Sequence, residues 1–289
     1  MAEVAAQPRW RGSGRSLPLF AILPLLPLAP ACARPESRSV GSATITLATT
    51  TSVRDSRLLD ALLPPFERAT GYDVKVLAVG SGQALELGRR GEADLLLVHD
   101  PEGERAFVEG GYGKARVPLM HNEFVIVGPS ADPARVRGLS VIRAFLQIAD
   151  SGALFISRAD RSGTHTREQA LWALAGRAPR GAWYRESGQG MSATLQIADQ
   201  LGAYTLTDVG TLFSHRYPLQ LEILVEGDSL LHNPYHLMVP DSGHFPWLEH
   251  AGARVLLEYL VGDGAREVIA AFGRDETGRT LFVPAPARP

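Results

Sequence analysis

Apolar and polar positions change their period repeatedly along the chain from Thr44 onward. Short, continuously apolar segments are followed by segments in which apolar residues recur every three or four positions, which is typical of one helix face. Small polar residues separate the two kinds of segment. The predicted strands of this first set are 45–48, 74–79 and 93–98, and the predicted helices are 58–66 and 84–90. Strands that alternate with helices predict the α/β class.

The same alternation resumes at Leu154. The predicted strands of this second set are 154–157 and 203–206. The predicted helices are 166–175 and one that opens at 187–191 and runs to about residue 201. Further helices are expected after Gly252, where leucines recur at helical spacing. A second group of α/β elements therefore follows the first.

Two segments far apart in the chain resemble each other. Residues 122–129 (NEFVIVGP) and 233–240 (NPYHLMVP) are both short, apolar and bounded by proline. They are either two ordinary strands that end at proline, or a pair of crossovers between two lobes. The second interpretation predicts a discontinuous first lobe, 42–125 plus 236–289, and a continuous second lobe, 126–235.

The N-terminus has the layout of a secretory signal. Three arginines precede an apolar run from Leu17 to Leu28, and small residues follow it. Prolines interrupt this run, whereas a membrane span needs about 20 consecutive apolar residues, so we predict a signal peptide, 1–31, and an exported protein. Cys32 is the only cysteine, which excludes an internal disulfide. Its position fits either a lipid anchor at Cys32 or cleavage at an A-x-A site.

The charge of the chain excludes one class of partner. The formal net charge is −2, and it becomes −4 when residues 1–31 are removed with their three arginines and one glutamate. Such a chain has no basic footprint for nucleic acid. If the protein binds an anion, local donors rather than global charge must hold it.

Four turns share one construction, in which a strand ends, Ser, Thr or Gly follow, and a helix starts. They are ATTTS (48–52), VGSGQ (79–83), SRADRSGTH (157–165) and SGQGM (187–191). A helix start exposes unpaired N–H groups at the positive end of the helix dipole, and hydroxyls add further donors. A single such turn is ordinarily an N-cap. Four of them at the carboxyl ends of strands, where ligands bind in open α/β sheets, predict an anion site.

Arg158 is the candidate residue with the greatest weight. It directly follows an apolar strand and stands beside the hydroxyl-rich turn that contains Ser162 and Thr164. The guanidinium fork of arginine suits oxyanions, because it donates several hydrogen bonds in one plane. Arg161 is nearby, but we expect Asp160 to neutralise it and leave it out of the contact set.

These motifs together resemble the tungstate-binding proteins of bacterial ABC importers, which are relatives of the phosphate and molybdate binders. The resemblance rests on ATTTS, VGSGQAL, RRGEADLLLVH, NEFVIVGP, SRADRSGTH, GQGM and GAYTLTD, in order, between about Thr44 and Phe282. It departs from the family at Ala159 and Arg161, where relatives commonly read SRGDDSGTH, and at Ser81, where threonine is usual.

The resemblance implies a type II periplasmic-binding-protein fold, in which two α/β lobes joined by two crossover strands close around an anion. It implies a membrane permease as partner, an extracytoplasmic location, no enzymatic activity, no cofactor and no metal, since tungstate is bound as an oxyanion. We expect a monomer. The ligand contacts that it implies are Thr50, Thr51, Ser52, Ser81, Arg158, Ser162, Gly163 and Thr164.

Hydrogen-bonding chemistry narrows the class of anion. Tungstate, molybdate and sulfate carry no proton at neutral pH, so a site made only of donors suits them, whereas hydrogen phosphate also needs an acceptor. Asp160 and Asp208 are the nearby carboxylates that would favour phosphate. The preference for tungstate over molybdate rests on the resemblance, because the two anions have nearly the same size and charge.

A secreted serine hydrolase is the alternative from a different class. It would use Ser162 with His165, or His99 with Asp100, but no third orienting group and no G-x-S-x-G turn accompany them. Four histidines near the C-terminus are spaced across a strand and loops rather than along one helix face, so we expect surface residues instead of a metal site. These are His232, His236, His244 and His250.

Overall fold

The structure is a computed structural model that describes residues 43–287. Strands and helices alternate through this part of the chain, which confirms the predicted α/β class. The strands are β1 (Thr44–Thr50), β2 (Asp73–Val79), β3 (Leu95–Val98), β4 (Val117–Pro129), β5 (Phe155–Ser157), β6 (Tyr184–Glu186), β7 (Thr205–Asp208), β8 (Leu221–Val225), β9 (His232–Met238) and β10 (Val283–Pro284).

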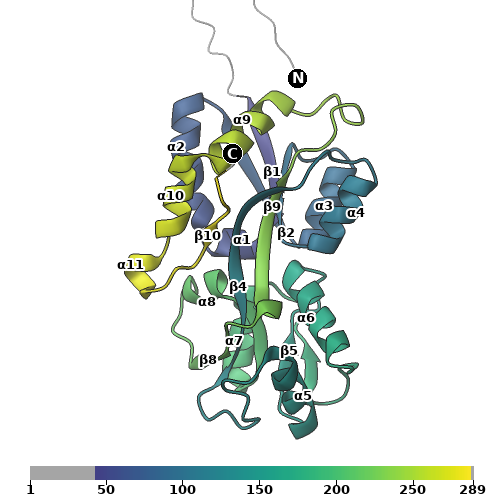
Figure 1. Cartoon of the computed structure of the whole chain (residues 1–289), viewed down its shortest axis with the longest axis vertical. Coiled ribbons are helices and arrows are strands. Elements are labelled where there is room, and N and C mark those ends of the chain that lie inside the picture. Colours follow the sequence, from purple (N-terminus) through teal and green to yellow (C-terminus); the bar gives the residue numbers. More distant parts are fainter. Residues whose placement is uncertain (1–42, 288–289) are drawn as a thin grey trace, which may run out of the picture. The chain divides into compact units, whose positions relative to one another are not determined.

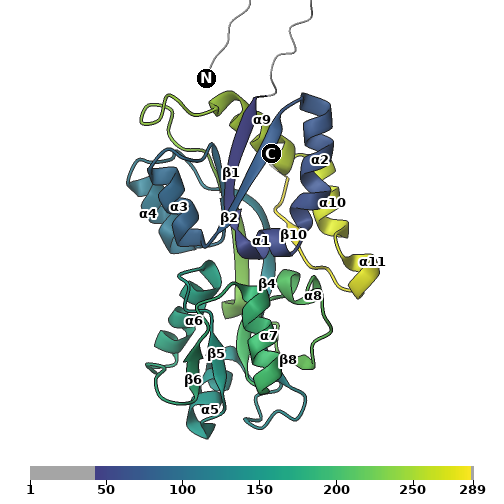
Figure 2. The same ribbon diagram turned by 180° about the vertical axis from the view of Figure 1, so that it is seen from behind.

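The helices lie on both sides of the strands (Figures 1 and 2), and their starts include the hydroxyl-rich turns. They are α1 (Thr51–Asp55), α2 (Leu58–Thr70), α3 (Ser81–Arg89), α4 (Pro101–Glu109), α5 (Val141–Ser151), α6 (Gly163–Leu174), α7 (Met191–Leu201), α8 (Val209–Phe213), α9 (His250–Val261), α10 (Asp263–Ala271) and α11 (Arg274–Thr277), with a 3-10 turn at Ser229–Leu231. No helix within residues 43–287 is both long and apolar enough to span a bilayer.

Two long strands, β4 and β9, connect the sheet regions. β1 pairs in parallel with β2 and β3, and β3 pairs with β9 in antiparallel orientation. The first half of β4 pairs with β9, and its second half pairs with β7 and β8 (Figure 1). Asn122 and Asn233 are register partners where β4 changes its pairing, so the two similar sequence segments lie side by side.

Buried apolar residues form two groups of clusters, and the boundary between the groups also falls where β4 changes its pairing. One group of clusters, named here the first core, draws its residues from 45–120 and 235–282. The other group, the second core, draws them from 124–231. The change from one core to the other therefore falls within β4 and again near the start of β9.

Two helices begin earlier than the apolar pattern predicts. α3 begins at Ser81 rather than at residue 84, and α6 begins at Gly163 rather than at residue 166. Caps explain the difference, because the side chain of Ser162 accepts a hydrogen bond from the backbone N–H of His165 and so starts the helix before its first apolar residue. The Ser, Thr and Gly residues of the turns thus belong to the first helical turns.

Two further boundaries differ from the predicted ones. After β1 the pattern predicts one helix, 58–66, which lies within α2. The structure adds a short helix, α1, before it, and Arg57 separates the two helices with a left-handed conformation at a φ of 66°. β7 covers Thr205–Asp208 rather than residues 203–206. This shift leaves Asp208 at the end of the strand, where its side chain caps α8. The predicted signal peptide and Cys32 lie outside the described residues.

Candidate functional site

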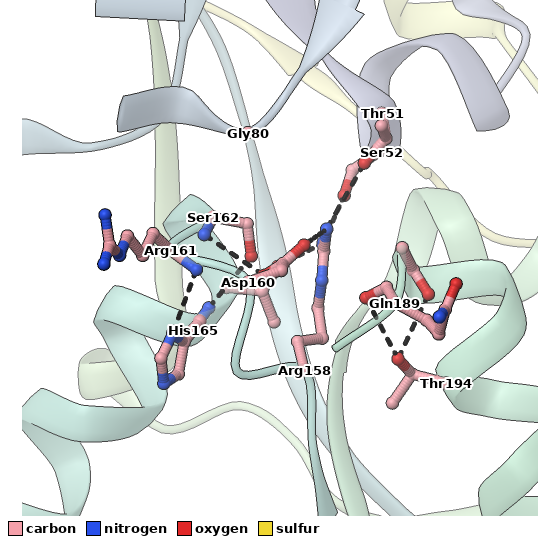
Figure 3. Close-up of polar contacts among 12 residues, drawn as sticks. Thr51, Ser52, Gly80, Arg158, Asp160, Arg161, Ser162, His165, Gln189 and Thr194 are labelled. Atoms are coloured by element: carbon pink, nitrogen blue, oxygen red, sulfur yellow. Dashed lines mark hydrogen bonds and ion pairs between the residues drawn. The ribbon is translucent and has the colours of Figure 1, made fainter. Parts of the chain in front are cut away.

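Arg158 lies at the centre of the polar contacts in Figure 3. It directly follows β5, and its side chain is only 2% exposed. Its Nη1 lies 3.3 Å from Ser52 Oγ and 3.5 Å from Thr164 Oγ1, and its Nη2 lies 3.3 Å from Thr51 Oγ1. These distances are at the long end of hydrogen-bonding range, so the guanidinium faces the hydroxyls without binding them tightly. One buried arginine thus faces hydroxyls from two helix starts that are far apart in the sequence.

The carboxylate beside Arg158 belongs to Asp160. Its Oδ2 accepts a hydrogen bond from Arg158 Nη2 at 2.5 Å, and its Oδ1 accepts one from the backbone N–H of Ser162 at 3.1 Å. The expectation that Asp160 neutralises Arg161 is therefore wrong. Ala159 and Arg161 have positive φ angles of 49° and 58°, an uncommon conformation that turns Asp160 back towards Arg158 and leaves Arg161 exposed.

The end of β1 supplies three of the predicted residues. Thr50 caps α1, and its Oγ1 accepts a hydrogen bond from the backbone N–H of Val53 at 3.3 Å. Because this oxygen acts as an acceptor, the hydroxyl hydrogen of Thr50 remains available for donation. Thr51 and Ser52 form the first turn of α1, and Ser52 is 1% exposed. The turn therefore presents its hydroxyls inside the protein, on the side of Arg158.

The end of β2 brings a second turn against the loop after β5. A side-chain carbon built at Gly80 would lie 3.6 Å from backbone atoms of Asp160, Arg161 and Ser162, so the two segments are in close proximity. Ser81, the first residue of α3, is fully buried. Within residues 43–287, its Oγ has no hydrogen-bond partner.

The start of α6 completes the loop that carries Arg158. Ser162 caps the helix, and Gly163 and Thr164 form its first turn. The N–H groups of a first turn have no partner inside the helix and lie at the positive end of its dipole. α6 has twelve residues, and Ser162 and Thr164 are each 1% exposed. The turn therefore combines buried hydroxyls with backbone donors.

A fourth turn, before α7, also lies close to these residues, although the expected ligand contacts include none of its residues. A side-chain carbon at Gly190 would lie 3.9 Å from Thr51 Oγ1. Thr194 holds this turn, because its hydroxyl lies 3.4 Å from the carbonyl of Gln189 and 3.1 Å from that of Gly190 (Figure 3). The repetition of the hydroxyl and glycine pattern at 187–191 was the only signal for it.

The structure brings the eight predicted residues to one place, in different ways. Direct contacts with Arg158 involve Thr51, Ser52 and Thr164. Ser162 is linked to Arg158 through Asp160. Thr50 and Gly163 adjoin these residues in the chain, and Ser81 adjoins Gly80, which lies against the loop.

The histidine and serine candidates of the hydrolase alternative have other partners. The Oγ of Ser162 accepts from the backbone N–H of His165, and the Nδ1 of that histidine accepts from the backbone N–H of Arg161 at 3.1 Å. The His165 ring therefore does not activate Ser162. His99 and Asp100 are likewise separate, since Asp100 caps α4.

The four histidines near the C-terminus, His232, His236, His244 and His250, have different partners. His232 packs beside His121 with ring centroids 4.6 Å apart, and His236 lies 2.9 Å from a carboxylate oxygen of Glu104. In the part of the chain that the structure describes, no group of three or more His, Cys, Asp or Glu residues is arranged to hold a metal ion.

Comparison with known proteins shows extensive similarity. The profile of the PBP superfamily domain matches residues 35–264. The tungstate-binding protein TupA of Peptoclostridium acidaminophilum is 41% identical over 247 residues, which are 84% of this chain and 86% of that protein.

Solved structures extend the similarity to the fold. The tungstate ABC transporter structure from Geobacter sulfurreducens is 43% identical with a TM-score of 0.73, and the match covers 79% of this chain and 98% of that one. The tungstate-binding protein TupA from Desulfovibrio alaskensis is 40% identical with a TM-score of 0.72, covering 84% and 99% of the two chains.

Proposed function

Because the chain belongs to the PBP superfamily, and within it to the family of tungstate-binding proteins, we propose that it captures tungstate for an ABC importer. It is the oxyanion-binding component, and a membrane permease receives the anion from it. Like its relatives, it is a solute-binding protein that works on the extracytoplasmic side of the membrane rather than an enzyme. Export by the segment 1–31, a lipid anchor at Cys32 and a monomeric state are parts of the same proposal.

One observation carries the proposal, the meeting of Arg158 with hydroxyls from separate helix starts. A buried guanidinium that faces Thr51, Ser52 and Thr164 at 3.3 to 3.5 Å has donors and positive charge directed at the same place. Arg158 Nε and Ser81 Oγ are also buried and lack hydrogen-bond partners among residues 43–287. Buried polar atoms in proteins are nearly always satisfied, so these atoms are suited to a polar ligand.

The carboxylates nearby favour an anion without a proton. Both oxygens of Asp160 already accept hydrogen bonds, from Arg158 and from the N–H of Ser162. Asp208 accepts from Thr211 and from Asn122. With these acceptors engaged, the remaining groups are chiefly donors, which suit tungstate, molybdate or sulfate better than hydrogen phosphate. Molybdate and sulfate are therefore the nearest alternatives, and phosphate follows them.

Tungstate is expected to raise the thermal stability of residues 32–289 more than the other anions do. A ligand that binds only the folded state at 100 times Kd stabilises it by about 2.7 kcal/mol, so the melting temperature should rise by several degrees. The measurement is a set of melts with tungstate, molybdate, sulfate and phosphate, followed by competition titration. Unchanged melting temperatures with all four anions would contradict the oxyanion function.

We propose that the two cores belong to two lobes, 42–125 with 236–289 and 126–235, which close on the anion by a hinge motion. The sequence separation of the contacts of Arg158 supports this, because Thr51 and Ser52 would lie in one lobe and Arg158 in the other. Small-angle X-ray scattering should show a smaller radius of gyration with tungstate than without it. Identical scattering curves, under conditions where binding is saturated, would exclude closure.

A further inference from the structure

A chain of four buried side chains runs through the two long strands. The Nδ2 of Asn122 donates to Asp208 Oδ1 at 3.1 Å, and the Nδ2 of Asn233 donates to Asn122 Oδ1 at 2.7 Å. The Oδ1 of Asn233 lies 2.9 Å from His99 Nδ1. We name these residues, Asp208, Asn122, Asn233 and His99, the crossover relay. Each is at most 4% exposed.

Asp208 determines the direction of every hydrogen bond in the crossover relay. It is held by the N–H and hydroxyl of Thr211 at 2.9 and 2.7 Å, and its carboxylate has only acceptors. Asn122 must therefore turn its NH2 group to Asp208 and its oxygen to Asn233. The NH2 group of Asn233 faces that oxygen, so its own oxygen faces His99, whose Nδ1 must carry the hydrogen.

His99 is consequently held in a single tautomer. Burial lowers the pKa of His99, and the charge of Arg158 lowers it further, which keeps the ring neutral although Asp208 and Asn233 act in the opposite direction. The Nε2 atom then presents a lone pair. It is buried, and no other atom of residues 43–287 forms a hydrogen bond with it. The ring also stacks on Tyr235 with centroids 4.7 Å apart.

The His99 residue packs against the start of α6. It follows β3, so it lies at the carboxyl end of a strand parallel to β1. A side-chain carbon at Gly163 would lie 2.6 Å from the His99 carbonyl oxygen and 2.8 Å from its Nδ1 and Cε1. Only glycine permits this approach. The helix start that bears Ser162 and Thr164 thus rests on the ring and backbone of His99.

We propose that His99 is a positioning residue for anion capture: the crossover relay fixes its ring, and the ring seats the first turn of α6 against the first core. This inference rests on the proposed function, because the seated turn carries Thr164 and adjoins Arg158. Turning the ring away would leave the Nδ1–H of His99 and the oxygen of Asn233 buried without partners, which costs far more than the loss of one exposed hydrogen bond. The crossover relay therefore resists rearrangement.

The tautomer is testable without any ligand. Nitrogen-15 NMR of the histidine side chains in the wild-type protein at neutral pH should show His99 with a hydrogen on Nδ1 and none on Nε2. A hydrogen on Nε2, or on both nitrogens, would overturn the proposal whether or not the protein binds tungstate. A His99→Leu variant assigns the resonance.

Binding kinetics test the positioning role. His99→Leu should raise the tungstate dissociation rate about tenfold and leave the association rate nearly unchanged, because His99 secures the closed arrangement and does not attract the anion. His99→Asn, which offers an amide N–H to Asn233, should recover part of the wild-type rate. An unchanged dissociation rate in His99→Leu would refute the role of His99.

Two variants separate positioning from general destabilisation. Asp94 is also buried in the first core, where it accepts from the N–H groups of Thr46 and Glu249. Asp94→Asn should lower the melting temperature without changing the dissociation rate, and a rise in that rate equal to that of His99→Leu would overturn the proposal.

If His99→Leu does not fold, Gly163→Ala provides the test, since its methyl group would press on His99 and should also speed dissociation. A wild-type dissociation rate in Gly163→Ala would refute the proposed role of the contact between His99 and the start of α6. Wild-type protein that binds none of the four anions would refute the proposed function instead.

Discussion

Arg158→Ala is expected to weaken tungstate binding by about 100- to 10,000-fold. Each charge-assisted hydrogen bond contributes roughly 1.5 to 3 kcal/mol, and the loss of two of them gives this range. The guanidinium is 2% exposed and faces Thr51, Ser52 and Thr164, so no other cation of the described site replaces it at that position. Isothermal titration calorimetry with tungstate measures the effect.

Two other substitutions give this experiment its controls. Arg161→Ala removes an exposed arginine three residues away, and it should leave the affinity within a few-fold of wild type. Arg158→Lys keeps the charge but loses the planar fork, so its affinity should fall between those of wild type and Arg158→Ala. Wild-type affinity in folded Arg158→Ala would remove Arg158 from the ligand contacts.

Wild type is expected to lose about 3 kcal/mol of its free energy of unfolding as the pH rises past the pKa of Glu168, and Glu168→Gln is expected to abolish this loss. Burial raises the pKa of Glu168 to about 7, although hydrogen bonds from Ser157, Tyr184 and Trp172 act in the opposite direction. Burial prevails because no cation among residues 43–287 pairs with this carboxylate, and each pKa unit corresponds to about 1.4 kcal/mol. A raised carboxyl pKa gives stability that is complete below the unfolded pKa, near 4.5, and that is lost as pH rises to 7.

The relevant measurement is urea-induced unfolding of wild type and Glu168→Gln at pH 5 and pH 8. The glutamine should gain stability relative to wild type on going from the lower to the higher pH, since its neutral amide still accepts from Tyr184 and Trp172. Glu186→Gln changes an exposed carboxylate nearby and should show no such gain. A difference between wild type and Glu168→Gln that is the same at both pH values would show that Glu168 is charged throughout. Because Ser157 directly precedes Arg158, its hydrogen bond to Glu168 also joins the loop that carries Arg158 to α6.

The four hydroxyl and glycine turns show how far local pattern reaches. Two of these turns contain a side-chain cap, Thr50 and Ser162, and capping depends on residues only three positions apart. The alternation of strand and helix, and the motifs shared with the tungstate binders, are equally local or lie in sequence order. These features were therefore accessible without a structure.

Contacts around Asp160 show where local pattern fails. The sequence places Asp160 between Arg158 and Arg161, and the expectation that it neutralises Arg161 is wrong. The choice depends on left-handed backbone at Ala159 and Arg161, which turns the carboxylate towards the buried arginine. Neither residue favours that conformation by its own chemistry, so the surrounding packing must impose it.

The sequence by itself determined the α/β class and the family, and it predicted hydroxyl-rich turns at helix starts, because each depends on short-range periodicity, capping or contiguous motifs. Only the tertiary structure decided which groups meet. His99 and Asn233 are 134 positions apart, and Arg158 and Ser52 are 106 apart. The similar segments that begin at Asn122 and Asn233 indicated that these two asparagines are related, but the directions of their hydrogen bonds are set by Asp208, which contacts Asn122 only through the fold. Hydrogen-bond direction depends on the exact partner at about 3 Å, and that partner is fixed by packing rather than by neighbours in the chain.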